Sequence, residues 1–169
     1  MNDEQDRPCV VYDCVVFLQG LIKETGPGVD CLELFEDGKI ELFISEAVLN
    51  EIGDVLTRPD LQQRFPLLTK ERAETLLENL RDRATYLESI PVEFTYQRDP
   101  KDEIYVNLAL AAGATYVVSR DNDLLDLMKD TEVGKSFRDR FPGLRILNPI
   151  AFLRELEQLS SHTGGSSDG

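Results

Sequence analysis

The stretch Val10-Val11-Tyr12-Asp13 is a short apolar run that ends on an acidic residue, and it predicts a buried first strand. Three further runs also read as strands: Ile40 to Ile44, Ala114 to Ser119 and Arg145 to Leu147. Helical patterns separate these runs from one another. Strands that alternate with helices predict a three-layer α/β/α domain around a central, mainly parallel sheet.

Polar caps and apolar periodicity place the helices between these strands. Ser45 and Asp102 are suited to begin helices, and Gly113 is suited to end one. The helices expected span about 31–37, 45–58, 69–86, 102–113, 124–128 and 149–159, and a further strand interrupted by Pro91 is expected over 87–92. The prediction is one domain over 9–158, with a polar segment 1–8 before it and a flexible Ser/Gly-rich segment 159–169 after it.

The composition is that expected of a globular cytoplasmic protein. The chain has 169 residues, of which 41% are hydrophobic, and this is enough for one domain with its own core. No apolar run approaches the ~18–20 residues of a membrane-spanning helix, and residues 1–8 are polar and acidic, unlike a signal peptide. Three cysteines without metal-ligand spacing, Cys9, Cys14 and Cys31, are expected to be free thiols in a reducing cytosol.

A single histidine and a strongly acidic charge argue against several kinds of chemistry. His162 lies in the Ser/Gly-rich segment, which argues against a Ser-His-Asp triad, a histidine-based ribonuclease and a His-ligated zinc site. The net charge is −14, and residues 9–158 keep 28 acids against 17 bases. Such a surface does not bind nucleic acid passively, so phosphate chemistry would have to use carboxylates and a metal.

Acidic residues stand where a parallel sheet builds its sites. Ligands bind outside the carboxyl ends of such strands, and Asp13, Asp121 and Asp123 follow two of the predicted strands. A buried carboxylate is costly unless something binds it, and Mg²⁺ and Mn²⁺ are commonly held by carboxylates. Each of these residues also suits a helix N-cap, and a cap role is compatible with a metal role.

Two further segments each offer a choice between two acids. Glu51 borders the apolar face of its predicted helix and can reach inward, whereas Glu46 in the first turn is explained by the helix dipole. Asp99 and Asp102 flank Pro100, and capping accounts for either of them. Periodicity alone leaves both choices open.

Ser119, Arg120 and Arg58 are candidates for substrate binding. The hydroxyl of Ser119 can bind a neighbouring carboxylate or a water molecule, and the two arginines suit a substrate phosphate. Arg98 and Lys101 share that character. A simpler explanation for all four cations is that they are solvated side chains that balance nearby acids.

Five segments keep a specific order and spacing along the chain. They are Asp13 with Cys14-Val15-Val16-Phe17-Leu18, Ser45-Glu46-Ala47-Val48-Leu49-Asn50-Glu51-Ile52, Val55-Leu56-Thr57-Arg58-Pro59, Asp99-Pro100-Lys101-Asp102-Glu103 with Ala109-Leu110-Ala111-Ala112-Gly113-Ala114, and Val118-Ser119-Arg120-Asp121-Asn122-Asp123-Leu124-Leu125. Together they resemble the PIN domain, and most closely the VapC-like toxin components of toxin–antitoxin systems. The resemblance extends from about Val10 to Leu156.

This resemblance implies a metal-dependent endoribonuclease that hydrolyses RNA phosphodiester bonds with Mg²⁺ or Mn²⁺. It also implies RNA as substrate and an antitoxin protein as partner. The resemblance favours Glu51 over Glu46 and Asp102 over Asp99. The implied metal ligands, of which the first four would also be catalytic, are Asp13, Glu51, Asp102, Asp121 and Asp123.

Val15 departs from the family pattern, which often has Asn two residues after the first Asp. The same residue argues against a phosphatase of the haloacid dehalogenase type, which needs a second Asp there. The alternative function is a PIN-fold interaction module with little or no nuclease activity, because an acidic surface suits a basic protein partner. The apolar stretch after Gly28 suits either the core or a homodimer face.

Overall fold

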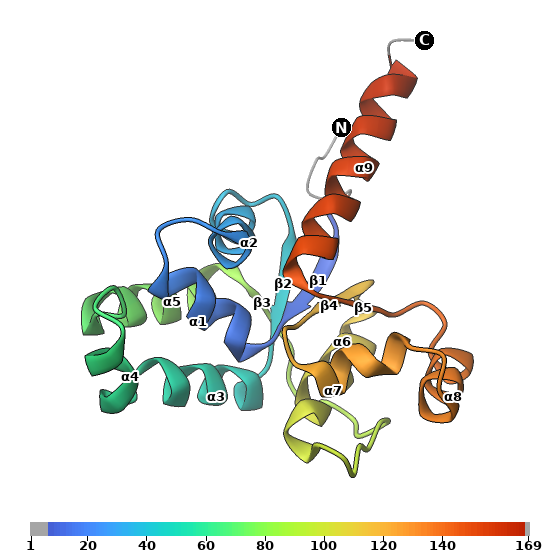
Figure 1. Cartoon of the computed structure of the whole chain (residues 1–169), viewed down its shortest axis with the longest axis horizontal. Helices are drawn as coiled ribbons and strands as arrows, with labels where there is room; N and C mark the ends of the chain where they lie inside the picture. Colours follow the sequence, from blue (N-terminus) through green and yellow to red (C-terminus); the bar gives the residue numbers. More distant parts are fainter. Residues whose placement is uncertain (1–6, 168–169) are drawn as a thin grey trace.

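Five parallel strands form the centre of the molecule (Figure 1). The computed structural model describes the backbone of residues 7–167 and the side chains of residues 7–160, so most of the polar segment 1–8 and the side chain of His162 lie outside it. The strand order is β3-β2-β1-β4-β5, and every neighbouring pair is parallel. The strands are β1 Cys9–Tyr12, β2 Glu41–Ile44, β3 Thr85–Tyr86, β4 Tyr116–Val118 and β5 Arg145–Leu147.

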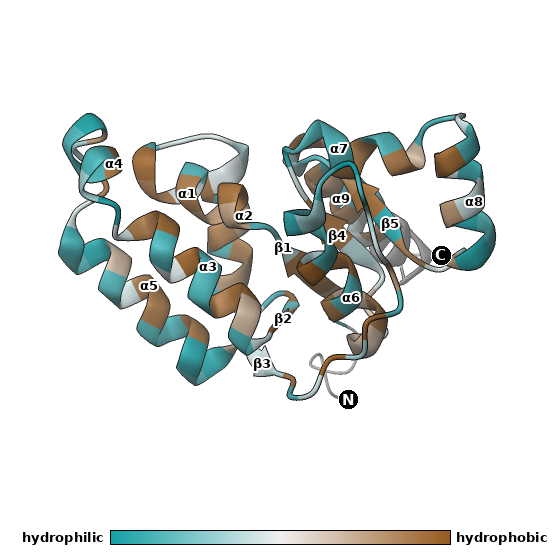
Figure 2. Ribbon diagram, turned by 90° about the horizontal axis from the view of Figure 1, so that it is seen from below, coloured by the Kyte–Doolittle hydropathy of each residue, from teal (hydrophilic) through white to brown (hydrophobic). Residues whose placement is uncertain are grey.

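Helices cover both faces of this sheet, which confirms the three-layer α/β architecture. Helix α6 packs against β1, β2 and β4, whereas α9 packs against β5 and α2 on the opposite face (Figure 2). The α-helices are α1 Cys14–Ile22, α2 Pro27–Glu36, α3 Glu46–Leu56, α4 Pro59–Arg64, α5 Lys70–Arg83, α6 Glu103–Ala112, α7 Asn122–Leu125, α8 Glu132–Arg140 and α9 Pro149–Ser167, and the 3₁₀ helices include η2 Pro100–Asp102 and η3 Asp126–Met128.

Local capping chemistry fixes where several helices begin and end. The Ser45 hydroxyl accepts a hydrogen bond from the backbone N–H of Val48 at 3.3 Å, which starts α3 as expected. Gly113 ends α6 in the left-handed conformation with φ of 66°, where a side chain would be strained. These caps hold the helices that carry the candidate site at set positions along the sheet.

The apolar side of α2 lies inside the domain. Cys31, Leu32 and Phe35 are buried there, and α2 packs against α1 and α9. The apolar stretch after Gly28 therefore contributes to the core. Cys9, Cys14 and Cys31 are free thiols. Among the residues that the structure describes, no helix combines the length and apolar character needed to span a bilayer.

The prediction of a strand over 87–92 is wrong. The chain pairs with β2 only at Thr85–Tyr86, so the helix expected to run to residue 86 also ends early, at Arg83. The chain then turns away, because Ser89 has a positive φ of 56° and Pro91 has no N–H for a ladder. Sequence periodicity also missed α4 and α8, which are short and largely polar.

The last helix runs further than the end expected at about residue 159. Helix α9 continues to Ser167, through the Ser/Gly-rich segment. Glycine costs about 1 kcal/mol relative to alanine inside a helix but leaves the backbone hydrogen bonds intact, and no proline interrupts this segment. Composition alone was therefore a poor guide to where the helix stops.

Residues 87–99, here called the strap, have no regular structure and are held by side chains of α6. The buried Asn107 accepts hydrogen bonds through Oδ1 from the backbone N–H groups of Glu93 at 3.0 Å and Phe94 at 2.8 Å. Its Nδ2 donates to the Phe94 carbonyl at 3.0 Å. Glu103 accepts from the Tyr96 N–H at 2.7 Å. The strap therefore reaches Asp99 along a fixed path.

Replacing Asn107 should test this anchoring. Asn107→Ala is expected to destabilise the domain by about 1–3 kcal/mol, because it leaves buried backbone groups of the strap without partners. Urea denaturation would measure the loss. The exposed Asn50 of α3 provides a matched control, since Asn50→Ala should change stability by less than about 0.5 kcal/mol. Equal denaturation midpoints for wild type and Asn107→Ala would contradict this account.

Candidate metal centre

The strand order reverses beside β1, and this is where the acidic residues gather. Strands β2 and β3 lie to one side of β1, and β4 and β5 lie to the other. In the register of the sheet, Val10 lies opposite both Leu42 and Tyr116, so the carboxyl ends of these strands meet at one edge. Such a switch point is where open parallel sheets bind ligands.

Asp13 follows β1 and is almost fully buried, with 3% of its surface exposed. Its Oδ1 accepts a hydrogen bond from the Val16 N–H at 3.0 Å, so it caps α1. Its Oδ2 accepts one from the hydroxyl of Ser119, at the end of β4. Burial raises the pKa of Asp13 to about 6, although these hydrogen bonds oppose the shift.

Ser119 links the two strand ends and is itself fully buried. Its hydroxyl donates to Asp13 and accepts a hydrogen bond from the backbone N–H of Asp121 at 2.9 Å. Asp121 then caps α7 by accepting from the Asp123 N–H at 2.8 Å. A single hydroxyl thus sets the positions of the acids that follow β1 and β4.

Four carboxylates form the acidic cluster, in which one oxygen of each lies within 4.8 Å of the others. Asp121 and Asp123 come from the segment after β4, and Asp99 and Asp102 come from the end of the strap and η2. Asp99 is a member of the cluster, although the family pattern favours Asp102 over it. Both belong to the cluster because the single turn of η2 brings both to the same side.

Asp102 is the buried member of the acidic cluster, with 5% of its surface exposed. Its Oδ2 is buried and has no hydrogen-bond partner. Burial raises the pKa of Asp102 to about 8, and the charges of Asp121, Asp99 and Asp13 add to the shift. An unpartnered carboxylate oxygen among like charges fits a divalent cation, because such ions bind through oxygen ligands.

Comparison with known proteins agrees with this geometry. A family model described as PIN domain matches residues 9–123, more than half of the chain. The chain belongs to the PIN domain family. PIN domains are generally nucleases that bind divalent metals and act on RNA, and the acidic cluster fits the active site of such a domain. The chain is also similar to uncharacterized protein MJ1680 of Methanocaldococcus jannaschii, with 26% identity over 152 residues that cover 90% of this chain and 94% of that protein.

Glu51 lies outside the acidic cluster of this PIN domain. It sits halfway along α3, partly buried, and its Oε1 is 3.6 Å from the thiol of Cys14. Cys14 directly follows Asp13, and its backbone N–H donates to the hydroxyl of the buried Tyr105 at 3.3 Å. Glu51 therefore approaches the site from the Asp13 side, through the first residue of α1.

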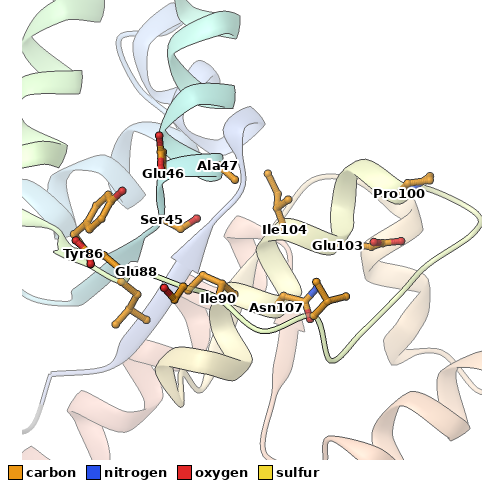
Figure 3. Close-up of a pocket in the computed structure, with 13 residues that line it drawn as sticks. Ser45, Glu46, Ala47, Tyr86, Glu88, Ile90, Pro100, Glu103, Ile104 and Asn107 are labelled. Carbon is orange, nitrogen blue, oxygen red and sulfur yellow. The ribbon is translucent and has the colours of Figure 1, made fainter.

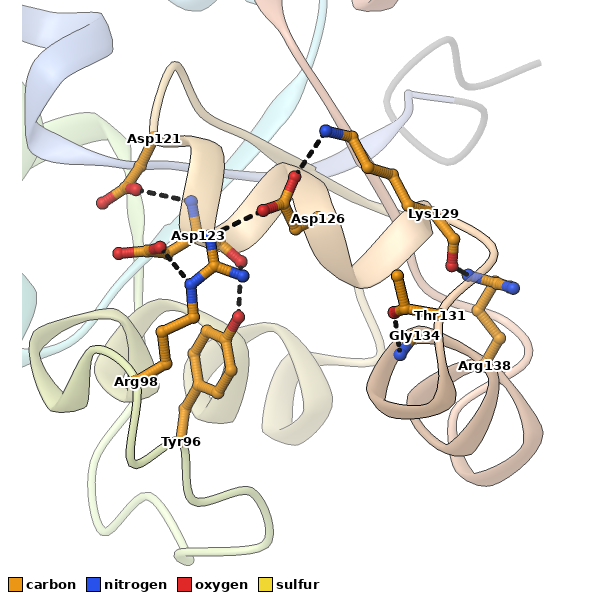
Figure 4. Close-up of polar contacts among 9 residues, drawn as sticks. All are labelled: Tyr96, Arg98, Asp121, Asp123, Asp126, Lys129, Thr131, Gly134 and Arg138. Carbon is orange, nitrogen blue, oxygen red and sulfur yellow. Dashed lines mark hydrogen bonds and ion pairs between the residues drawn. The ribbon is translucent and has the colours of Figure 1, made fainter.

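The ion pair with the acidic cluster comes from Arg98 and from neither of the arginines predicted to bind substrate, Arg58 and Arg120. Arg58 is exposed in the short connection between α3 and α4. Arg120 has an exposed side chain, while its backbone N–H bonds Asp13. Arg98 instead binds Asp123, with 2.5 Å between Nε and Oδ1 (Figure 4). Its place immediately before Asp99 was the only sequence signal for this contact.

Asp102 should make the stability of the metal-free PIN domain depend on pH. Its pKa in the folded chain, about 8, lies above the ordinary value of 3.8 for an aspartate. The folded state then binds more protons than the unfolded state between these values, so stability falls as pH rises through that window. Asp102→Asn removes this loss and should raise the Tm at about pH 8 by several degrees, since about 1 kcal/mol corresponds to roughly 2–4 °C.

Thermal unfolding in EDTA from about pH 5 to about pH 8 checks this expectation. The Tm difference between Asp102→Asn and wild type should grow with pH. Asp54→Asn, on an exposed part of α3, is the matched control and should give a flat difference. A difference for Asp102→Asn that does not change with pH would show that Asp102 is ionised throughout.

Proposed function

We propose that this PIN domain is a metal-dependent endoribonuclease that hydrolyses RNA phosphodiester bonds. The observation that carries the proposal is the unpartnered, buried oxygen of Asp102 within a cluster of four carboxylates. The cluster lies at the switch point of a parallel sheet, where this architecture binds ligands. Within the residues whose side chains the structure describes there is no histidine, so catalysis would depend on these acids.

Asp99, Asp102, Asp121 and Asp123 would hold Mg²⁺ or Mn²⁺, with Asp13 and Glu51 completing the site from the β1 side. A bound divalent cation supplies an acidified water and neutralises charge on a phosphate. Oxygen-rich sets of this kind suit these hard cations better than softer metals.

The residues of the chain itself have three tasks in this proposal. Ser119 holds Asp13 and Asp121 in fixed relation across β1 and β4. The strap, anchored by Asn107, carries Asp99 to the same place. Asp13 and Asp102 would bring negative charge to the buried side of the ion, since their raised pKa values belong to the metal-free site, where no cation offsets that charge.

The finer proposal is that this nuclease is the VapC-like toxin of a toxin–antitoxin pair, whose antitoxin is a protein with a basic segment. The net charge of −14 supports a basic partner. A homodimer is also part of this proposal. Its clearest test is whether a small DNA-binding protein is encoded beside this one and forms a complex with it.

An interaction module without nuclease activity is the second candidate. The acidic surface favours it, because a net charge of −14 repels RNA over most of the molecule. Val15, where the family often has Asn, removes a polar group that would orient a carboxylate. Under this reading the fold would serve to bind a protein.

Incubation of the purified chain with a diverse pool of RNAs discriminates between the candidates. The nuclease is expected to cut RNA with Mn²⁺ or Mg²⁺ and to stop when EDTA is added. Calorimetry with Mn²⁺ alone measures metal binding independently of activity. Intact RNA together with no heat of metal binding would reject the nuclease and favour the interaction module.

A further inference from the structure

Two cavities are lined by residues that are chain neighbours of the acidic cluster. The first, here called the Glu46 pocket, has a volume of about 600 Å³ and lies between the start of α3, the strap and α6 (Figure 3). The second, here called the Arg98 pocket, has a volume of about 500 Å³ and is lined by Tyr96, Gln97, Arg98, Asp126, Lys129, Thr131 and Val133. They offer two candidate paths for a strand of RNA that reaches the cluster.

The charges of the two cavities differ in sign. Three carboxylates and no cation line the Glu46 pocket, namely those of Glu46, Glu88 and Glu103. Two cations and one carboxylate line the Arg98 pocket. The Glu46 pocket repels phosphate, and the Arg98 pocket attracts it.

Asp126 holds the two cations of the Arg98 pocket side by side. Its Oδ2 lies 2.6 Å from Arg98 Nη2, and its Oδ1 lies 2.7 Å from Lys129 Nζ. Lys129 and Arg98 also lower the pKa of Asp126, so this carboxylate stays charged near neutral pH. The side chains of Arg98 and Lys129 remain 50% and 66% exposed, which leaves donors free to face a ligand.

Arg98 links the Arg98 pocket to the acidic cluster. Arg98 directly precedes Asp99 in the chain, and its Nε binds Asp123, another member of the cluster. Figure 4 shows Asp121, Asp123, Asp126 and Lys129 following one another from the cluster into the pocket. A phosphate next to a bond cut at the cluster would therefore meet these cations first.

We propose that the Arg98 pocket binds the phosphodiester backbone of the RNA strand next to the cleaved linkage, with Arg98 and Lys129 as the phosphate ligands. The proposal rests on the proposed nuclease function and says where the RNA substrate would lie. Arginine and lysine are the usual partners of phosphate oxygens. Because the chain has a net charge of −14, these two cations beside the acids would attract the RNA backbone to this side of the cluster.

Lys129→Gln tests this assignment, because Lys129 touches none of the four clustered acids. Anisotropy of a short fluorescein-labelled single-stranded RNA should report about tenfold weaker binding, and the salt slope should fall by about 0.7 for one lost phosphate contact. KM should rise by a similar factor while kcat stays unchanged, and Lys129→Arg should restore binding. Far-UV circular dichroism and the Tm shift with Mn²⁺ establish that fold and metal binding are intact.

Two matched variants make the test specific. Lys135→Gln removes a lysine that pairs with Asp130 outside the pocket, and it should leave RNA binding within about twofold of wild type. Glu88→Gln, in the Glu46 pocket, should also leave it within that range at moderate salt. Equal losses for Lys129→Gln and Lys135→Gln, or a marked gain for Glu88→Gln, would overturn the assignment.

The results for wild type and Lys129→Gln distinguish a failure of the phosphate-binding assignment from a failure of the proposed nuclease function. RNA cleavage by wild type together with unchanged KM in Lys129→Gln would overturn the placement of the strand alone. Absence of both RNA binding and cleavage by wild type, despite a Tm shift with Mn²⁺, would overturn the nuclease and this proposal together.

Discussion

Asp13→Asn is expected to lower the rate of RNA cleavage by about a thousandfold while leaving the fold intact. Asp13 lies outside the four-carboxylate cluster but would complete the metal site from the β1 side. Loss of such a carboxylate would remove several kcal/mol of transition-state stabilisation, and about 1.4 kcal/mol corresponds to a factor of ten in rate. The substitution removes a charge from a residue that is 3% exposed and hydrogen-bonded to Ser119.

The fold should survive this change because asparagine is as good an N-cap as aspartate. The side-chain oxygen of Asn can still accept the hydrogen bond from the Val16 N–H that starts α1. Cleavage of a labelled RNA under single-turnover conditions with Mn²⁺ measures the rate, and circular dichroism measures the fold. Asp60→Asn, in the exposed first turn of α4, is a control that should keep full activity.

A rate for Asp13→Asn within about tenfold of wild type would place catalysis elsewhere. If Asp13→Asn loses both structure and activity, a second substitution tests whether cleavage depends on the acids at the strand ends. Asp121→Asn serves here, since it keeps the cap of α7 and is expected to lose activity to a similar extent.

Millimolar Mg²⁺ or Mn²⁺ is expected to raise the Tm of the wild-type chain by roughly 5–10 °C. Binding at a concentration about 100-fold above Kd stabilises a fold by about 2.7 kcal/mol, and about 1 kcal/mol corresponds to roughly 2–4 °C for a domain of this size. The gain arises because the ion relieves repulsion among Asp99, Asp102, Asp121 and Asp123, which lie within 4.8 Å of one another.

General screening must be separated from specific binding in this experiment. With a net charge of −14, the chain can gain stability from any salt. NaCl at matched ionic strength should therefore give a much smaller Tm rise, and Asp121→Asn should lose most of the shift with Mn²⁺. Equal shifts with NaCl and Mn²⁺ would count against a metal site.

The strand ends were predictable because their signals are local. Asp13 and the Asp121–Asp123 segment each follow an apolar run, and a parallel sheet brings the ends of its strands to one edge. Ser45 and Gly113 were predictable for the same reason, since a cap depends on its own few neighbours.

The strap and its contacts were not predictable from local patterns. Its course depends on Asn107, which lies on α6 and reaches back to Phe94 through hydrogen bonds that periodicity does not encode. A strand interrupted by Pro91 was expected over 87–92, but Ser89 and Pro91 turn the chain away from β2. The strap in turn decides where Asp99 and Arg98 lie.

Strand patterns and chain order were enough to predict a parallel α/β domain and the acids that follow β1 and β4, because both depend on neighbouring residues. Which other acids join them depends on contacts between distant segments of the folded chain. The tertiary structure brought Asp99 beside Asp102, kept Glu51 on the Cys14 side and paired Arg98 with Asp123. The physical reason is that like charges gather only where a folded chain holds them, and the contacts that hold them join residues far apart in sequence.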